Sequence, residues 1–506
     1  MKILVANRGE IAVRVMRACR EMGLASVAVY SDADRAAPHV RYADQAYPLG
    51  PSEPHASYLS IEKLLDVASR AGVDAVHPGY GFLAENAAFA SACVDAGLTF
   101  IGPSPAVIAR MGSKTAARQA AADAGVPLVP GTEEPIGENV PIDSIASAAV
   151  GIGFPVLVKA VAGGGGKGMR AASSPADLAS AVRAARSEAQ SSFGCPELYL
   201  ERRLTRPRHI EIQVLGDGRG RAVPFVEREC SIQRRHQKVV EESPSLAVDP
   251  ALREALAAAA VALAEAVQYG GAGTIEFLLD EDGRFYFLEM NTRLQVEHPV
   301  TECVTGVDLV QWQIRIARGE PLDLAAERLL EPTGHAIECR VYAEDPGAGF
   351  LPSPGRIRSI RPPSGPGIRD DAGVDAGFDV PIFYDPLISK LVAWAEDRQH
   401  AVARMARALD EYELTGIKTT IPFFQWLMRQ PDFLSGRFDT TYLDGLLESG
   451  AGTTFSTTTS ELETLATFGA AIHHYLESTR AAAPTRAGAP TSGSAWRLAA
   501  RRDALR

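Results

Sequence analysis

Residues 284–302 read RFYFLEMNTRLQVEHPVTE, and this stretch decides how the rest of the chain is interpreted. Read as an extended strand, it has two faces, because successive side chains of a strand point in opposite directions. One face is apolar, with Thr292 as its only polar interruption. The other face carries a row of functional groups: Glu289, Asn291, Arg293, Gln295 and Glu297.

A turn at Asp282-Gly283 would join this strand to the preceding segment, TIEFLLDEDG, as a hairpin. A two-residue type I′ turn there places Glu276 directly opposite Glu289. Two opposed carboxylates about 5 Å apart repel by roughly 3 kcal/mol at an effective dielectric constant near 20. A hard dication would compensate this repulsion, and Asn291 offers a third oxygen ligand. The pattern predicts a Mg²⁺ site that holds phosphates, and its apolar flanks favour this over a solvated hairpin face.

Length and composition limit the possible functions. The chain has 506 residues, 22% of them charged, which predicts a globular protein of about three domains. It contains no signal-like start and no run of about 18 apolar residues, so we expect a cytoplasmic protein without membrane contact. Its six cysteines include no C-x-x-C, which argues against a disulfide framework or a zinc site. The net charge of −11 argues against a nucleic-acid surface.

The first hundred or so residues alternate between strand and helix patterns. The segments KILVAN, SVAVYS, DAVHPG and LTFIGP predict strands, and IAVRVMRACREMG and YLSIEKLLDVASRAG predict helices. This order predicts a parallel, Rossmann-like unit, although its loop NRGE is not the G-x-G-x-x-G fingerprint of dinucleotide binding. The loop HPGYGFLAEN, residues 77–86, follows a strand where ligands bind in such sheets. An ordinary turn that only ends the strand would equally explain its glycines.

Basic and glycine-rich segments downstream indicate a phosphate-bearing ligand. A helical segment at 106–125 carries Lys114, and Lys159 ends an apolar strand, where a lysine is costly unless it meets an anion. Four glycines at 163–166 and then Lys167 follow, and such a loop can surround a phosphate or close as a lid. Alone, this loop is as typical of a linker or turn. Together with the carboxylate pair, it predicts binding of a nucleoside triphosphate.

Three further segments extend the sheet and the candidate site. LYLERRL and HIEIQVLGD predict strands, and ALREALAAAAVALAEAVQYG predicts a long helix beside the hairpin. Residues 233–238, QRRHQK, concentrate basic groups. A solvated turn ordinarily explains such a cluster, but a suspected triphosphate favours an anion-binding wall.

The last part of the chain divides into a folded segment and a tail. Residues 332–445, with GHAIECRVYAED and FYDPLISKLVAWA, predict a compact α+β domain. Beyond Gly450 we expect a helix at 461–478, a linker and a basic amphipathic end. The end is either disordered or docks a partner. Trp496, Leu498 and Leu505 favour docking, because clustered exposed apolar side chains mark interaction sites.

These motifs together resemble biotin carboxylase, the ATP-grasp component of biotin-dependent carboxylases. The resemblance covers residues 1 to about 445, through ANRGEIA, HPGYGFLAEN, GGGGKGM, RRHQKVVEE, EMNTRLQVEHPVTE and ECRVYAED. It implies an α/β and α+β fold. The implied parts are a Rossmann-like N-terminal domain at 1–113, an ATP-grasp domain with a mobile glycine-rich lid at 114–331, an α+β C-terminal domain at 332–445 and a helical or linker tail at 446–506.

The resemblance also implies roles for individual residues. Mg²⁺ or Mn²⁺ would be held by Glu276, Glu289 and Asn291. Nucleotide and other ligand contacts would come from Tyr80, Lys114, Lys159, Gly165, Gly166, Glu201, Arg202, Arg203, Leu204, His209, Gln233 and His236. Bicarbonate would lie among Lys238, Arg293, Gln295 and Val296. The sequence departs from the family pattern at Lys167, where some members carry Arg. This difference is mild, because lysine keeps the positive charge and lacks only the planar guanidinium group of arginine.

The implied reaction makes Glu297 the general base that deprotonates bicarbonate for attack on the γ-phosphate of ATP. The carboxyphosphate formed would collapse to CO₂ and phosphate, the phosphate would take the ureido proton of biotin, and Arg340 would stabilise the biotin enolate. Two rival functions share parts of this site: an ATP-grasp ligase that joins a carboxylate to an amine, and a non-catalytic nucleotide-binding regulator. The first has no need of RRHQK and EHPVTE, and the full set of base, metal ligands and cations argues against the second.

We expect the biotin to be carried by a different polypeptide. The family attaches biotin to a lysine in an A-M-K-M-like hairpin, whereas here the last lysine is Lys418 and the only Met-Lys pair is Met1-Lys2. The expected partners are a biotin carboxyl carrier protein, a separate carboxyltransferase and a second copy of the chain in a homodimer. The final acceptor would be an acyl-CoA such as acetyl-CoA or propionyl-CoA, with a two-chain pyruvate carboxylase as the alternative.

Overall fold

The computed structural model describes residues 1–132, 134–161, 169–450, 455 and 460–481. The chain forms two compact units, Met1–Phe455 and Ser456–Arg506. Several sequence predictions lie outside the described residues: Gly165 and Gly166 with the rest of the predicted lid loop, nearly all of the predicted linker, and the basic end from Ser494 that was predicted to dock a partner.

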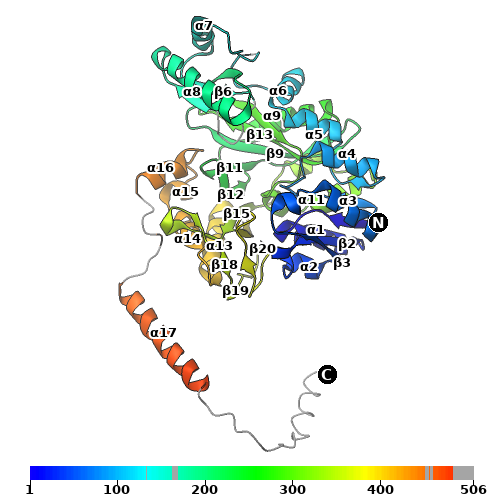
Figure 1. Ribbon diagram of the computed structural model, residues 1–506. Helices are drawn as coiled ribbons and strands as arrows, with labels where there is room; N and C mark the ends of the chain where they lie inside the picture. Colours follow the sequence, from blue (N-terminus) through cyan, green and yellow to red (C-terminus); the bar gives the residue numbers. More distant parts are fainter. Residues whose placement is uncertain (133, 162–168, 451–454, 456–459, 482–506) are drawn as a thin grey trace, which may run out of the picture. The chain divides into compact units, whose positions relative to one another are not determined.

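A five-stranded parallel sheet begins the first unit, with strand order β3-β2-β1-β4-β5. Its strands are β1 (Lys2–Val5), β2 (Ala25–Ser31), β3 (Gln45–Gly50), β4 (Ala75–His77) and β5 (Thr99–Phe100). Two predicted helices, α1 (Gly9–Glu21) and α3 (Ile61–Ala71), pack on it (Figure 1). Ile3 and Val5 contribute to the core with α1, whereas Leu4 contributes to the core with α3, as the period of two requires. The predicted Rossmann-like unit is confirmed, and β3 is an addition.

A nine-stranded antiparallel sheet forms the centre of the first unit. Its main order is β14-β13-β9-β11-β12-β15-β22-β20, and β10 pairs with β9. The strands are β9 (Arg208–Asp217), β10 (Ala222–Pro224), β11 (Arg228–Arg234), β12 (Gln237–Ser243), β13 (Gly270–Leu279), β14 (Phe285–Asn291), β15 (His335–Tyr342), β20 (Ile368–Ala372) and β22 (Leu387–Ala395). The β12–β15 pairing carries the sheet across residue 331, where a domain boundary is predicted.

The hairpin β13–β14 has the predicted register at its carboxylates and a different turn. Asp280 N donates to Arg284 O at 2.8 Å, so the loop has three residues, and Gly283 takes the left-handed conformation at φ 76°. The prediction of a two-residue turn is therefore wrong. A bulge at Leu288, between the Phe277–Phe287 and Glu276–Glu289 pairs, restores the register. The predicted opposition of Glu276 and Glu289 is confirmed.

The extended interpretation of residues 284–302 is wrong beyond Asn291, where β14 ends. The chain bends at 292–293, turns, and begins helix α10 (His298–Thr305), with Pro299 in its first turn. Proline suits this position because its missing N–H is not needed there. Leu294 is fully buried in the core below the bend. The polar residues after Asn291 therefore reach the site from a turn rather than from a strand.

A small sheet of order β7-β6-β8 lies between the two larger ones in the sequence. It comprises β6 (Val156–Ala160), β7 (Met169–Ala172) and β8 (Leu198–Arg202), with helices α7 (Ile142–Ile152) and α8 (Pro175–Phe193). Before it, the single helical segment predicted at 106–125 is two helices, α5 (Pro105–Gly112) and α6 (Lys114–Asp123). Ser113 separates them, and its hydroxyl caps α6 by accepting from Ala116 N.

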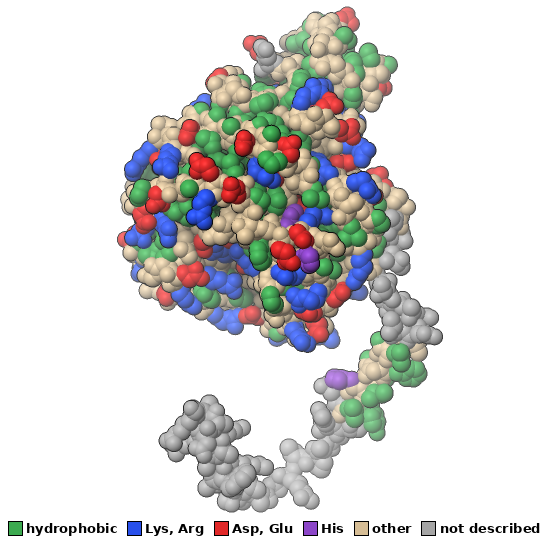
Figure 2. Space-filling view, turned by 180° about the vertical axis from the view of Figure 1, so that it is seen from behind, with side chains coloured by type: hydrophobic (Ala, Val, Ile, Leu, Met, Phe, Trp, Pro, Cys, Tyr) green, Lys and Arg blue, Asp and Glu red, His purple; other side chains and the backbone are tan. Residues whose placement is uncertain are grey.

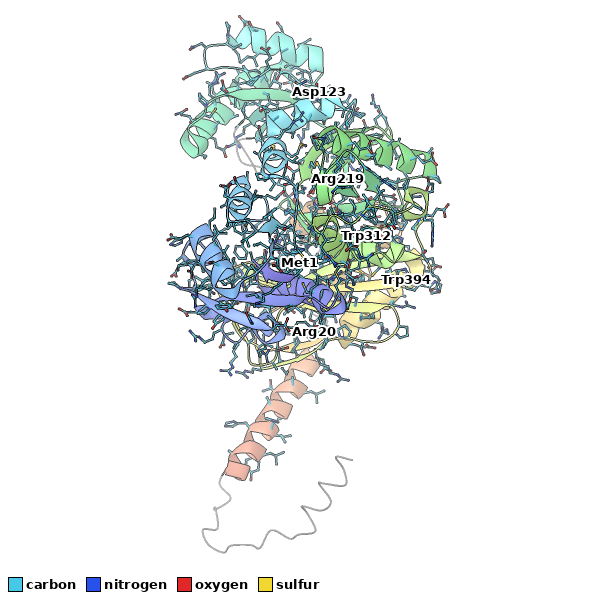
Figure 3. The ribbon with its side chains drawn as sticks, turned by 90° about the vertical axis from the view of Figure 1, so that its right-hand side faces the viewer. Met1, Arg20, Asp123, Arg219, Trp312 and Trp394 are labelled. Carbon is cyan, nitrogen blue, oxygen red and sulfur yellow. The ribbon has the colours of Figure 1, made fainter. Side chains whose placement is uncertain are left out.

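The remaining elements complete the first unit. The helices are α2 (Pro38–Tyr42), α4 (Ala87–Asp95), α9 (Pro250–Ala266), α11 (Leu309–Ala317), α12 (Ala326–Leu329), α13 (Arg398–Glu411), α14 (Ile421–Leu427), α15 (Pro431–Leu434) and α16 (Tyr442–Glu448). The short strands are β16 (Glu344–Asp345), β17 (Leu351–Pro352), β18 (Gly355–Arg356), β19 (Ser359–Arg361), β21 (Asp379–Val380) and β23 (Glu413–Thr415). Figure 3 labels Trp312 of α11, which packs into the core shared with α1, and Trp394 of β22.

The second unit contains helix α17 (Ser460–Ala481), which confirms the helix predicted at 461–478. Hydrophobic side chains line it visibly in Figure 2, and five of them are largely exposed: Leu465, Phe468, Ile472, Tyr475 and Leu476. Among the residues that the structure describes, no helix combines the length and apolar character needed to cross a membrane.

Candidate active site

The opposed carboxylates of β13 and β14 form one end of the site. Glu276 faces Glu289, and Asn291 Nδ2 donates to Glu276 Oε1 at 2.9 Å. The Glu289 side chain is exposed to solvent, and partial desolvation, followed by repulsion from Glu276, raises its pKa. Asn291 Oδ1 accepts from Arg293 Nη2 at 3.0 Å, a bond that metal binding would replace. Two repelling carboxylates and an amide oxygen are hard ligands, so this set fits Mg²⁺ or Mn²⁺.

A second group of potential ligands lies beside the first. Atoms of His209, Glu211 and Glu276 lie within 4.8 Å of one another, and His209 Nε2 is 2.9 Å from Glu276 Oε2. Lys238 Nζ, however, donates to Glu211 at 2.5 Å and to Glu276 at 2.8 Å. This ammonium contacts both carboxylates of the second group but only one carboxylate of the hairpin pair, so the hairpin pair and Asn291 are the better fit to a metal ion.

Glu297 is the best-supported proton acceptor of the site. It is 2% exposed and immediately precedes α10, whose N-terminus favours a negative charge. Lys238 Nζ donates to Glu297 Oε1 at 2.7 Å, and Arg340 Nη2 donates to Oε2 at 3.0 Å. Although burial opposes ionisation, these cations hold the pKa of Glu297 well below its usual range. The carboxylate is therefore ionised at neutral pH, as the sequence predicts.

The turn after β14 places the other predicted bicarbonate contacts. Gln295 Nε2 donates to Glu276 Oε1 at 2.7 Å, and Val296 O accepts from Lys390 Nζ at 3.0 Å. Arg293 Nε donates to Glu85 Oε2 at 2.8 Å. Glu85 belongs to the loop HPGYGFLAEN, so the loop that the sequence indicated as ligand-binding reaches this turn. Arg293 is held by Glu85 and Asn291, and the guanidinium that contacts Glu297 is that of Arg340.

The buried guanidinium group of Arg228 connects the elements that carry the site. Arg228 is fully buried, and burial opposes its charge while Glu211 and Glu297 raise its pKa. It forms an ion pair with Glu211. Its other donations, at 2.7 to 3.0 Å, go to Gln213, Thr274, Gln295 and Thr301. Arg228 thus ties β9, β11, β13 and α10 together beneath the predicted bicarbonate contacts.

Two lysines mark the predicted phosphate end. Lys159 on β6 pairs with Glu201 of β8, which also accepts from Arg118 Nη1 at 2.5 Å. Burial, and then the neighbouring charge of Lys159, lowers the pKa of Lys114. Because two like charges in close proximity are costly, an anion between these lysines would be favoured.

Other predicted ligand residues have varied positions. Gln233 Nε2 lies 3.1 Å from His209 Nδ1, so these two meet across β9 and β11. His236 is exposed in the β11–β12 turn. Tyr80 lies beside Lys390, whose Nζ is 5.5 Å from the ring centroid.

The segment after β8 faces several directions. Arg202 Nη2 lies 3.4 Å from Asp280 Oδ2. Arg203 is exposed, and Leu204 is half-buried in the following loop. The structure therefore brings Glu201 to Lys159 but turns the side chain of Arg202 toward the hairpin loop. Any nucleotide contact by residues 201–204 would be expected from the main chain.

Comparison with known proteins identifies the family. Residues 1–108 match the model of the biotin carboxylase N-terminal domain, and residues 338–445 match that of the biotin carboxylase C-terminal domain. Residues 113–325 match the carbamoyl-phosphate synthase L chain ATP-binding domain. Biotin carboxylase 1 of Bacillus subtilis is 50% identical over 444 residues, which cover 88% of this chain and 98% of that protein. The chain belongs to the biotin carboxylase family.

Two further similarities are to carboxylases that are named for different substrates. A pyruvate carboxylase subunit from Methanothermobacter thermautotrophicus is 52% identical over 443 residues, covering 88% of this chain and 89% of the relative. The biotin carboxylase domain dimer of Hydrogenobacter thermophilus 2-oxoglutarate carboxylase, a complex with MgADP, ADP and bicarbonate, matches with a TM-score of 0.82 and 46% identity. That match covers 90% of this chain and 99% of the solved chain. The ATP-grasp fold predicted from the resemblance is thereby confirmed.

Some residues of this biotin carboxylase site escaped the sequence interpretation. Glu211 and Glu241 are fully buried and pair with the predicted catalytic side chains Lys238 and Arg340. Arg228 is also fully buried and binds Glu211 and the predicted bicarbonate contact Gln295, yet none of the three was selected from the sequence. A signal existed for Glu211, because it alternates with Ile210 and Ile212 on the polar face of a strand. Arg228 and Glu241 lie in segments without a clear period of two, so only the folded sheet reveals them.

Proposed function

We propose that this chain catalyses the ATP- and bicarbonate-dependent carboxylation of biotin held on a separate carrier protein. The observation that carries the proposal is the buried Glu297 carboxylate between Lys238 and Arg340, next to the opposed Glu276 and Glu289. This arrangement offers one proton acceptor, cations for an anionic substrate and oxygen ligands for a metal.

The resting site holds Glu297 ionised but weakly basic, because both of its oxygens contact cations. Bicarbonate bound by Lys238 would draw part of that positive charge away and raise the basicity of Glu297. The base then takes the hydroxyl proton of bicarbonate, and the electron pair of the broken O–H bond stays on the substrate oxygen. That oxygen attacks the γ-phosphorus of ATP, which forms carboxyphosphate and releases ADP.

Lys114 and Lys159 would bind the phosphate groups of ATP as point charges. Glu276, Glu289 and Asn291 would hold Mg²⁺ or Mn²⁺, which when bound neutralises phosphate charge. His209 and Gln233 would border the nucleotide from β9 and β11. Gly165 and Gly166 would cover the phosphates from the predicted lid.

In the second step, carboxyphosphate collapses to CO₂ and phosphate, and the phosphate takes the ureido proton of biotin. Arg340 would stabilise the resulting enolate, whose nitrogen captures CO₂ to form carboxybiotin. Arg340 is suited to this role because its guanidinium is already at the base, 3.0 Å from Glu297.

We propose that the carboxybiotin serves an acyl-CoA carboxylase of the acetyl-CoA or propionyl-CoA type. A carrier protein and a carboxyltransferase would be separate polypeptides, and the chain would act as a homodimer in the cytoplasm. Similarity to a methylcrotonoyl-CoA carboxylase subunit alpha of Oryza sativa, 49% identical over 445 residues, supports an acyl-CoA acceptor. Similarity to the Methanothermobacter pyruvate carboxylase subunit supports a two-chain pyruvate carboxylase as the second candidate. We also propose the domain division 1–113, 114–331, 332–445 and 446–506.

Bicarbonate-dependent, biotin-stimulated ADP release tests the activity. A biotin carboxylase releases ADP with bicarbonate and accelerates with free biotin. A carboxylate–amine ligase would need an amine substrate instead, and a regulator would bind ATP without turnover. Adding the purified carrier and carboxyltransferase with acetyl-CoA, propionyl-CoA or pyruvate in turn then identifies the acceptor.

A further inference from the structure

A second pair of opposed carboxyl groups lies on the central sheet, outside the metal ligands. Glu241 of β12 and Glu338 of β15 are direct cross-strand partners. Both side chains are fully buried. Like charges directly opposite each other on a sheet are unfavourable, and burial increases the cost of each charge. The reaction proposed above gives neither residue a role.

Arg340 connects this pair to the base. Its Nη2 atom lies 2.5 Å from Glu241 Oε1 and 3.0 Å from Glu297 Oε2. The bond to Glu297 has hydrogen-bond geometry, whereas the contact with Glu241 is an ion pair only. One guanidinium nitrogen is therefore shared by two carboxylates. Glu338 lies two residues before Arg340 on β15, and neither of its oxygens has a hydrogen-bond partner among the described residues.

Burial and the surrounding charges shift the pKa values of the two acids to different extents. Burial, and then repulsion by Glu241, raises the pKa of Glu338 well above its usual value, although Lys390 opposes this shift. Burial also raises the pKa of Glu241, to about 7, although Arg340 opposes it. The ionisable groups that face the pair from neighbouring elements are Lys238 of β12, Arg340 of β15, Lys390 of β22, Cys230 of β11, and Glu297 and Cys303 at α10.

We propose that Glu241 is a positioning residue that shares Arg340 with the base Glu297, while Glu338 carries the proton that the opposed carboxyl groups cannot both release. This inference deepens the proposed function and rests on it. In the resting site, Arg340 is divided between two anions. When Glu297 accepts the bicarbonate proton and becomes neutral, Glu241 is the anion that still holds Arg340 in place for the biotin enolate.

The two acids must carry different charges in this arrangement. Glu241 must be negatively charged, so Glu241→Gln removes its function. Glu338 must be neutral, so Glu338→Gln copies the shape and charge of the protonated acid. A matched control is Glu227→Gln, which also neutralises a fully buried glutamate, here paired with Arg253. Thermal unfolding of all three variants establishes that each is folded.

Kinetics with free biotin from pH 6 to 9 test the positioning role. We expect Glu241→Gln to lower kcat/KM for biotin about tenfold, with KM for ATP changed less than about twofold, because the loss concerns only the second step. For the wild type we expect kcat/KM for biotin to change with pH near 7, and for Glu241→Gln we expect this change to be absent. Glu338→Gln should lower kcat/KM for biotin by less than about threefold at pH 7. The inference would be overturned if kcat/KM for biotin fell equally in Glu241→Gln, Glu338→Gln and Glu227→Gln.

Infrared difference spectroscopy tests the proton without relying on activity. A protonated buried carboxyl group has a carbonyl stretch at a higher frequency than any band of a carboxylate or of an amide. We expect this band in wild type and in Glu227→Gln at neutral pH, and its loss in Glu338→Gln. An unchanged band in Glu338→Gln would overturn the assignment of the proton. If the wild type shows no bicarbonate-dependent ADP release, the proposed function fails, and the infrared result still decides where the proton resides.

Discussion

At the scale of single residues, Glu297 carries the most direct prediction. Lys238 and Arg340 contact its two oxygens, and Glu297→Gln keeps the shape of the side chain while removing the proton acceptor. We expect kcat for bicarbonate-dependent ADP formation to fall by roughly 10² to 10⁴, the usual contribution of a general base. The dissociation constant for ATP should be nearly unchanged. Steady-state kinetics and a nucleotide titration measure both quantities.

The matched control for this variant is Glu320→Gln. Glu320 is an exposed glutamate that pairs with Arg318, and it lies outside the site. It should keep wild-type kinetics. A parallel loss of ATP affinity and turnover in Glu297→Gln would contradict the role of Glu297 as a base and indicate damage to the nucleotide site.

Asp371 carries a prediction about pH and stability. It is buried and binds Arg369 Nη2 at 2.7 Å. Although burial opposes ionisation, Arg369 lowers the pKa of Asp371 from 3.8 to about 2. A carboxyl group with a lowered folded-state pKa stabilises the fold above its unfolded pKa, and this contribution is lost as pH falls through the folded value. At about 1.4 kcal/mol per pKa unit, Asp371→Asn should lower the free energy of unfolding by about 2 kcal/mol at pH 7.

Urea unfolding of wild type and Asp371→Asn at several pH values measures this contribution. The difference in the free energy of unfolding should be constant above about pH 5 and narrow as pH falls from about 4 toward 2. Asp375→Asn, an exposed carboxylate paired with Arg41, is the control and should change the free energy by less than about 0.5 kcal/mol. If the difference in the free energy of unfolding between wild type and Asp371→Asn grew as pH fell, this would contradict the ion-pair explanation.

At the scale of elements, the β13–β14 hairpin determines the metal ligands. Glu289→Gln removes one carboxylate of the opposed pair and leaves Glu276 with its contacts to Lys238 and His209. We expect ATP hydrolysis by this variant to need a higher Mg²⁺ concentration for half-maximal rate, because one charged oxygen ligand is lost. A Mg²⁺ titration of the rate measures the shift.

The control for the metal prediction lies on the same hairpin. Asp282→Asn neutralises an exposed carboxylate of the loop, which pairs with Arg284. It should leave the Mg²⁺ titration unchanged. An unchanged titration in Glu289→Gln would mean that Glu289 does not bind the metal, even though it faces Glu276.

The hairpin also shows what the sequence can and cannot predict. The opposition of Glu276 and Glu289 was predicted from an assumed two-residue turn, and it holds because the bulge at Leu288 compensates for the extra residue of the actual loop. The turn was predicted wrongly, because a local Asp-Gly signal does not reveal the bulge at Leu288. The polar alternation continued past Asn291 although the strand did not. There the burial of Leu294 and the start of α10 outweighed the local pattern.

The folded sheet supplied what the linear pattern could not. Four strands of the N-terminal sheet, β1, β2, β4 and β5, and its helices α1 and α3 were predicted from short apolar runs and helical periodicity, whereas β3 was not. The pairing of Glu241 with Glu338 joins residues far apart in the chain, on strands separated by several helices and the hairpin. Cross-strand neighbours of this kind depend on sheet order, which one sequence does not specify.

At the scale of the whole molecule, the lysine content predicts that this chain is not itself biotinylated. Its last lysine is Lys418, and its only Met-Lys pair is Met1-Lys2. Expressing the chain with active biotin ligase and probing with streptavidin should give no band at its mass. The carrier protein, expressed in the same cells, is the positive control. A covalently biotinylated band from this chain would contradict the proposal of a separate carrier.

The bulge at Leu288 makes one codon of the gene dispensable for the register of the hairpin. An in-frame deletion of that codon would remove the unpaired residue and leave the pairs on both sides of it as they are, so Glu289 would still face Glu276. Loss of the codon for Met290, only two positions later, would instead bring Asn291 opposite Ile275 and turn it to the other face. That deletion would remove one proposed metal ligand and one core side chain together.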